Sequence, residues 1–195
     1  NRYAKPLVKT WNGPNGPVQV SVLYTPDYAS NAEPVLQATI DSLDYFSKTL
    51  GGYPYGTATA VVPPYGADEA GGMEYPTFFT ADSTSQDEPG TLGRFALDFV
   101  TVHEFGHGYF YGILASNEFE EPMLDEGMNE YWDQRMMSGR KQDLILTTPF
   151  LRALGIGTKL TPFDMERLGA SLADPADALG DNSWSRLSSG SYGTV

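Results

Sequence analysis

The sequence predicts an α+β protein in which a small twisted sheet precedes a group of helices. Before residue 90 the strand-like segments dominate: residues 18–24 alternate valine and leucine with polar residues, and residues 57–62 favour a strand. After residue 90 the apolar residues recur at helical spacing. We therefore expect residues 1–195 to form one domain, with a mostly sheet lobe over 1–90 and a mostly helical lobe over 91–195.

Five helices are expected, either from apolar residues at helical spacing or from a capping residue at the helix start. Thr148 and Thr161, each followed by a proline, are the expected caps of the last two helices. A glycine follows the end of the third helix at Gly139 and is expected to terminate it. The five helices are expected over residues 34–50, 91–111, 123–138, 149–154 and 162–168.

The composition narrows the possible functions. A hydrophobic content of 41% is typical of a globular protein, and a net charge of −13 argues against binding to nucleic acid. No run of apolar residues reaches the roughly 18–20 that a membrane helix needs, so no membrane segment is expected in this chain. Because the chain has no cysteine, any metal site must use nitrogen and oxygen ligands.

A metal-binding pattern lies inside the second expected helix, at His103-Glu104-Phe105-Gly106-His107. Side chains four residues apart on a helix share one face, so both imidazoles can bind one ion. Glu104 follows the first histidine and is placed to act as a general base toward a metal-bound water. These two histidines are the only ones in the chain, which makes a chance pairing improbable.

A third ligand is expected at Glu126, because catalytic zinc commonly uses two histidines and a carboxylate. Eighteen residues separate His107 from Glu126, which begins the next expected helix. Glu130 and Asp133 lie four and seven residues further on, on the same helical face. Either could accept the second N–H group of a ligating histidine. The alternative, that both are solvated carboxylates, stays open.

This spacing resembles that of the gluzincin aminopeptidases of the M1 family. The family has the same histidine pattern, eighteen intervening residues, a glutamate, a glycine such as Gly127, and an aromatic residue near Tyr131. Thermolysin-type enzymes place the glutamate one residue farther away. The resemblance implies a thermolysin-like catalytic domain that binds one zinc ion through His103, His107 and Glu126.

A second segment, Gly71-Gly72-Met73-Glu74-Tyr75, resembles the G-x-M-E-N segment of the same family. The resemblance implies that Gly71, Gly72, Met73 and Glu74 bind substrate and that Glu74 binds its free amino group. Tyr192, 66 residues after Glu126, matches the family tyrosine that stabilises the oxyanion.

Two departures from the family pattern leave strict aminopeptidase specificity open. Tyr75 replaces the asparagine, and residues 108–112 replace the family's Q-W-F-G-N.

The resemblance implies a metallopeptidase acting on peptides with a free N-terminus. Family members are several times longer, so the chain is expected to be the catalytic part of a multidomain protein with neighbouring domains as partners. Two alternatives stay open. One is a zinc endopeptidase or non-peptide hydrolase using the same site, and the other is a zinc-binding scaffold module without catalysis.

Overall fold

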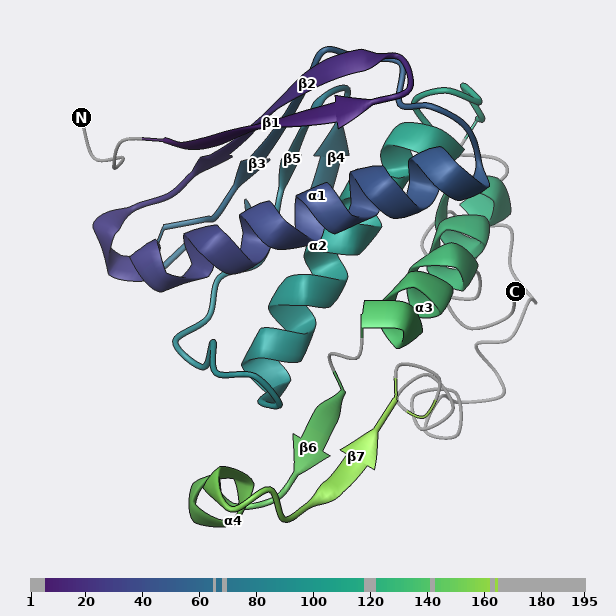
Figure 1. Cartoon of the computed structure of the whole chain (residues 1–195). Coiled ribbons are helices and arrows are strands. Elements are labelled where there is room, and N and C mark those ends of the chain that lie inside the picture. The colour runs from purple at the N-terminus through teal and green to yellow at the C-terminus, as the bar shows by residue number, and fades with distance from the viewer. Residues whose placement is uncertain are drawn as a thin grey trace.

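The computed structural model describes residues 6–64, 66–67, 70–117, 122–140, 143–161 and 164. A five-stranded sheet carries helices on one of its faces, and a small two-stranded sheet follows later in the chain (Figure 1). The predicted mixture of a small sheet and helices is therefore confirmed. No helix in these described ranges is long and apolar enough to cross a membrane.

The main sheet is mixed, with strand order β1-β2-β3-β5-β4. An antiparallel hairpin of β1 and β2 begins it, β3 and β5 run parallel to β2, and β4 pairs antiparallel with β5 at the edge. Strand β1 was not expected, whereas β2 and β3 match the two predicted strands. The strands are β1 (Leu7–Gly13), β2 (Gly16–Leu23), β3 (Thr57–Val61), β4 (Met73–Tyr75) and β5 (Phe78–Thr80).

The first long helix, α1 (Ala32–Thr49), lies along the inner face of the sheet after a short 3₁₀ segment at Pro26–Asn31 (Figure 1). Side chains alternate across β2, so Val18, Val20 and Val22 are buried beneath this helix. The helix ends before Gly51, whose φ of 128° suits a glycine, as the sequence predicts.

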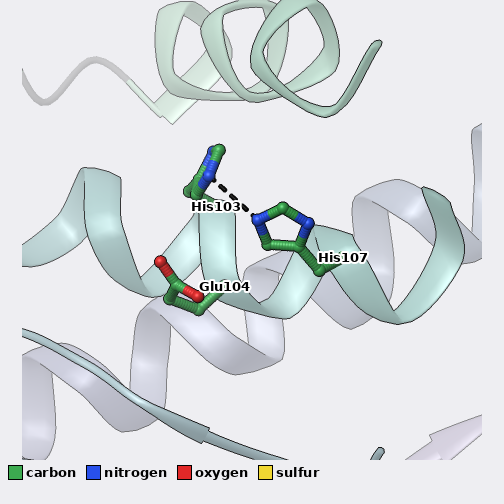
Figure 2. A group of neighbouring side chains, drawn as sticks. All are labelled: His103, Glu104 and His107. Atoms are coloured by element: carbon green, nitrogen blue, oxygen red, sulfur yellow. Dashed lines mark hydrogen bonds between the residues drawn. The ribbon is translucent and has the colours of Figure 1, made fainter. Parts of the chain in front are cut away.

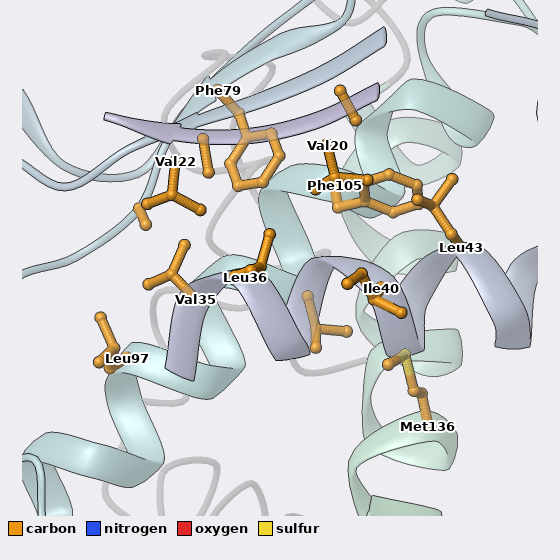
Figure 3. Close-up of a cluster of buried hydrophobic side chains, with 14 of the residues drawn as sticks. Val20, Val22, Val35, Leu36, Ile40, Leu43, Phe79, Leu97, Phe105 and Met136 are labelled. Carbon is orange, nitrogen blue, oxygen red and sulfur yellow. The ribbon is translucent and has the colours of Figure 1, made fainter. Parts of the chain in front are cut away.

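The second long helix, α2 (Leu92–Phe110), crosses beneath the sheet and packs against α1. Its predicted start is confirmed, because the Thr91 side chain accepts a hydrogen bond from the Arg94 backbone N–H. Phe105 on this helix stacks against Phe46 of α1, with ring centroids 6.1 Å apart. Figure 3 shows Phe105 with the valine and leucine side chains of the same core.

The third expected helix has two parts, a π-helical turn (Met123–Gly127) and α3 (Met128–Arg140). The prediction that Gly139 terminates this helix was wrong. The helix continues through Gly139 to Arg140. The Arg140 guanidinium pairs with Asp41 of α1 and lies 3.7 Å from Oδ1 of Asp98 on α2.

A small hairpin follows α3, formed by β6 (Leu144–Leu146), α4 (Pro149–Ala153) and β7 (Thr158–Leu160) (Figure 1). Neither strand was expected. The Thr148 cap of α4 is confirmed, because its side chain accepts a hydrogen bond from the Leu151 backbone N–H. Thr161 and Asp164 exchange the hydrogen bonds of a capping box, but most of the expected 162–168 helix lies outside the described residues.

Candidate metal centre

The two histidines of the predicted motif lie one turn apart on α2 and face the same space (Figure 2). Both rings are buried, and their Nε2 atoms are 3.0 Å apart. The rings are nearly perpendicular, with an interplanar angle of 87°. This orientation lets both nitrogens point at one position instead of stacking the rings.

Glu126 is brought to the same position by the π-helical turn. Its Oε2 atom lies 3.4 Å from Nε2 of His103 and 3.8 Å from Nε2 of His107. Ligands placed tetrahedrally around zinc at 2.0–2.1 Å are about 3.3 Å from one another. The three measured separations lie on both sides of this value, so the nitrogen and oxygen donors present fit a single zinc ion.

Two aspartates hold the other nitrogen of each ring. Oδ2 of Asp133 lies 2.8 Å from Nδ1 of His103, and Oδ1 of Asp125 lies 2.5 Å from Nδ1 of His107. A carboxylate that accepts the Nδ1–H group leaves the Nε2 lone pair available for a metal. Both aspartates are fully buried, which fixes the direction of each ring.

The sequence left open whether Glu130 or Asp133 accepts the second N–H group of a ligating histidine. In the structure Asp133 is hydrogen-bonded to His103, and Glu130 is not within hydrogen-bond distance of it. Oε2 of Glu130 is 3.8 Å from Nδ1 of His103, and its Oε1 accepts a hydrogen bond from Gln134. Asp125 was missed. The available sequence signal was its position directly before Glu126. That position indicates a role at the site only once the π-helical turn at these residues is known, because such turns are frequent at functional sites.

Gly106, the fourth residue of the motif, has a packing role. A Cβ atom at Gly106 would lie 1.9 Å from Oδ1 of Asn129 on α3. The side-chain amide of Asn129 donates a hydrogen bond of 2.8 Å to the backbone carbonyl of His103. The absence of a side chain at Gly106 therefore lets α3 approach the metal-binding helix closely enough to brace it.

Burial and neighbouring charges shift the pKa values of the two histidines in opposite directions when no metal is bound. Burial alone would lower the pKa of His103, but hydrogen bonds to the carboxylates of Asp133 and Glu126 raise it well above its usual value. Burial and the neighbouring charge of His103 lower the pKa of His107 to about 4. The site thus favours one positive charge, the proton on His103, among its carboxylates. A bound metal cation can replace that proton as the positive charge.

Glu104 lies on α2 beside the two histidines (Figure 2). Burial raises its pKa to about 8, with further contributions from nearby carboxylates that include Glu74. Its Oε2 atom is buried and has no hydrogen-bond partner among the described residues. A buried carboxylate with an available oxygen and a pKa near neutrality is suited to proton transfer.

The predicted substrate segment borders this group. A carboxylate oxygen of Glu74, a ring nitrogen of His107 and a carboxylate oxygen of Asp125 all lie within 4.8 Å of one another. A Cβ atom at Gly72 would lie 3.5 Å from Oε1 of Glu104. Glu74 and Gly72 are therefore next to the histidines, with Gly71 and Met73 beside them in the chain. Tyr192 lies outside the described residues.

The arrangement of sheet and helices is similar to part of a solved structure. That structure is the crystal structure of Legionella pneumophila aminopeptidase A in complex with aspartic acid, with a TM-score of 0.55 and 14% sequence identity. The similarity covers 78% of this chain but 18% of that chain, so this chain spans less than one fifth of that chain's length. No family model matches the sequence, and no curated protein matches it significantly.

Proposed function

We propose that this chain is the catalytic part of a zinc-dependent aminopeptidase with a thermolysin-like fold, similar to the M1 family. The observation that carries this proposal is the triangle formed by Nε2 of His103, Nε2 of His107 and Oε2 of Glu126. The fold similarity to an aminopeptidase supports a peptidase function independently of that triangle.

His103, His107 and Glu126 would hold the zinc ion. When bound in such a site, zinc polarises a substrate carbonyl and lowers the pKa of a coordinated water toward neutrality. Asp133 and Asp125 keep the two imidazoles in the tautomer that presents Nε2. Asn129 and Gly106 keep the backbone of the metal-binding helix in place.

Glu104 performs the proton transfers. Its available Oε2 atom accepts a proton from the attacking water, holds it in the buried environment, and donates it to the amine that leaves. A general base of this kind typically contributes about 10²–10⁴-fold to the rate. Tyr192 stays a prediction as the donor to the oxyanion, because its position is not among the described residues.

Glu74 makes removal of the first residue the favoured reaction. In a peptide the amino nitrogen is only about 2.5 Å from the carbonyl carbon of the same residue. A carboxylate within 4.8 Å of a ring nitrogen of His107 would therefore be close enough to bind that amine when the first carbonyl lies next to the histidines. Strand β4 is at the edge of the sheet, where an extended substrate can pair with it.

Paired fluorogenic peptides, one with a free and one with an acetylated N-terminus, test this function in the zinc-loaded protein. We expect hydrolysis of the free peptide only, and loss of that hydrolysis when a chelator removes the metal. Equal hydrolysis of both peptides would refute the role of Glu74 and favour an endopeptidase. No hydrolysis of free peptides by protein with one bound zinc would favour the non-catalytic alternative.

The role of Glu104 is tested by Glu104→Gln. This variant should bind zinc with the same stoichiometry, measured by metal analysis, while its turnover falls about 10²–10⁴-fold. Activity within about twofold of the original protein would contradict the assignment of the proton transfers to Glu104.

A further inference from the structure

Polar side chains make up most of the buried residues of α3. The buried apolar residues on this helix are Met136 and Met137, and the buried polar ones are Asn129, Glu130, Asp133 and Gln134. Buried polar groups are directional and must keep their partners, so they specify one arrangement of the helices more strictly than apolar packing does. The position of α3 relative to the metal-binding helix therefore depends on which polar contacts hold it.

One face of α3 contacts the metal-binding helix at His103. Asn129 donates a hydrogen bond of 2.8 Å to the His103 carbonyl, and Oδ2 of Asp133 lies 2.8 Å from Nδ1 of His103. Arg140 is seven residues after Asp133, which places it on the same face of the helix, about 10 Å further along the axis. Arg140 is thus at the far end of the face that presents Asp133 to the histidine.

The guanidinium of Arg140 joins three helices. It pairs with Asp41 of α1, and its Nη2 atom lies 3.7 Å from Oδ1 of Asp98 on α2. Oδ2 of Asp98 lies 3.0 Å from Nε of Arg94. Two positive and two negative charges therefore meet at this end of α3. The side chains of Arg140 and Asp98 are buried, and their attraction is stronger there than it would be in water.

The two arginines of this cluster differ in what they connect. Arg94 and Asp98 are four residues apart on α2, so their pair stays within one helix. Arg140 connects α3 to α1 and α2, so its contacts restrict the distance between helices. Loss of Arg140 alone would leave Asp98 paired with Arg94, and Asp41 is 35% exposed to solvent. The domain can therefore fold without Arg140, with α3 less firmly held.

We propose that Arg140 is a positioning residue for the metal centre, which ties the end of α3 to α1 and α2 and so keeps Asp133 at Nδ1 of His103. The inference rests on the proposed zinc site and goes beyond it, because it assigns part of the metal affinity to a residue outside the ligand set. Loss of a residue that orients a metal ligand typically weakens metal binding about 10- to 100-fold. Since Arg140 acts through Asp133, we expect a loss of about 10-fold, at the lower end of this range.

The test compares Arg140→Met with Arg94→Met. Both changes remove a guanidinium that faces Asp98 and keep an unbranched side chain, but only the first releases α3. Competition with a chromophoric chelator measures zinc affinity, and the visible absorption spectrum of protein saturated with Co²⁺ reports the geometry of the ligands. We expect about 10-fold weaker zinc binding and a changed cobalt spectrum in Arg140→Met, with both unaltered in Arg94→Met.

Urea unfolding of the metal-free variants distinguishes positioning from a purely structural role. If Arg140→Met lowers stability but leaves the zinc affinity of the folded protein and the cobalt spectrum unchanged, the inference is overturned. Equal weakening of zinc binding in both variants would also overturn it, because the effect would then come from Asp98 and not from the position of α3.

Two further outcomes are informative. If the unaltered protein binds no zinc, the metal centre and the proposed function are refuted together, whereas zinc binding that is insensitive to Arg140 refutes the inference alone. If Arg140→Met does not fold, Asp41→Asn weakens the same connection from the side of α1. Zinc binding should then weaken in Asp41→Asn, and an unchanged affinity would overturn the inference.

Discussion

Replacing Gly106 by alanine is expected to loosen the metal centre without touching any ligand. The new methyl group would lie 1.9 Å from Oδ1 of Asn129, so Asn129 or the whole of α3 must move by more than 1 Å to restore a contact of 3.0 Å. Asn129 is fully buried, so its side chain cannot turn into solvent. The movement breaks its hydrogen bond to the carbonyl of His103.

The magnitude follows from opposing contributions. Overpacking costs about 1–3 kcal/mol and the lost hydrogen bond about 1 kcal/mol, while alanine gains about 1 kcal/mol over glycine inside a helix. The net free energy of unfolding should therefore fall by about 1–3 kcal/mol. Gly108→Ala is the matched control, since a Cβ atom there meets nothing within 4 Å. That variant should gain up to about 1 kcal/mol.

Urea unfolding of both variants measures this difference, and competition with a chromophoric chelator measures the zinc affinity. We expect the two variants to differ by about 2–4 kcal/mol in stability, with weaker zinc binding only in Gly106→Ala. Equal stability of the two variants, together with an unchanged zinc affinity, would refute the idea that Gly106 sets the approach of α3.

Two further predictions concern the support of the site and the core. Asp125→Asn should weaken zinc binding about 10- to 100-fold in the same chelator competition, because the neutral amide holds His107 less firmly. Asp27→Asn, an exposed change of the same kind, should leave the affinity unaltered, and equal affinities in both variants would contradict the role of Asp125. Phe46→Ala should cost about 3–5 kcal/mol in urea unfolding, since Phe46 is fully buried against Phe105. A loss below about 1 kcal/mol would show that this contact is not central to the core.

The parts of the fold that the sequence predicts well are those specified by local chemistry. Thr91 starts α2 and Gly51 follows α1, because capping bonds and left-handed backbone depend on neighbouring residues only. Strand β1 was missed because most of its side chains are exposed and show no apolar alternation. Asn15 in the turn, followed directly by Gly16, was the available signal for that hairpin.

In the candidate site, too, some features follow from local sequence and others depend on how the helices pack. The helical spacing of His103 and His107 predicts that their nitrogens share one face, and the structure places them 3.0 Å apart. Which carboxylate meets which Nδ1 atom depends on how the π-helical turn and α3 pack against α2, and helical periodicity contains no information about that packing. Asp125 was missed for this reason. Gly139 was expected to end the helix, which instead reaches Arg140, a residue that pairs with Asp41 of α1.

The open edge of the sheet has a consequence for handling the protein. Edge strands are templates for aggregation, and proteins usually protect them with charges or prolines. On β4, Met73 and Tyr75 are exposed, and Glu74 is the only charged residue of the strand. The carboxylate of Glu74, the proposed anchor for the substrate amine, is therefore also the charge that opposes pairing of this edge with another copy of the chain. A Glu74→Gln variant should therefore be assayed at several protein concentrations, with light scattering, before lost activity is assigned to lost substrate binding.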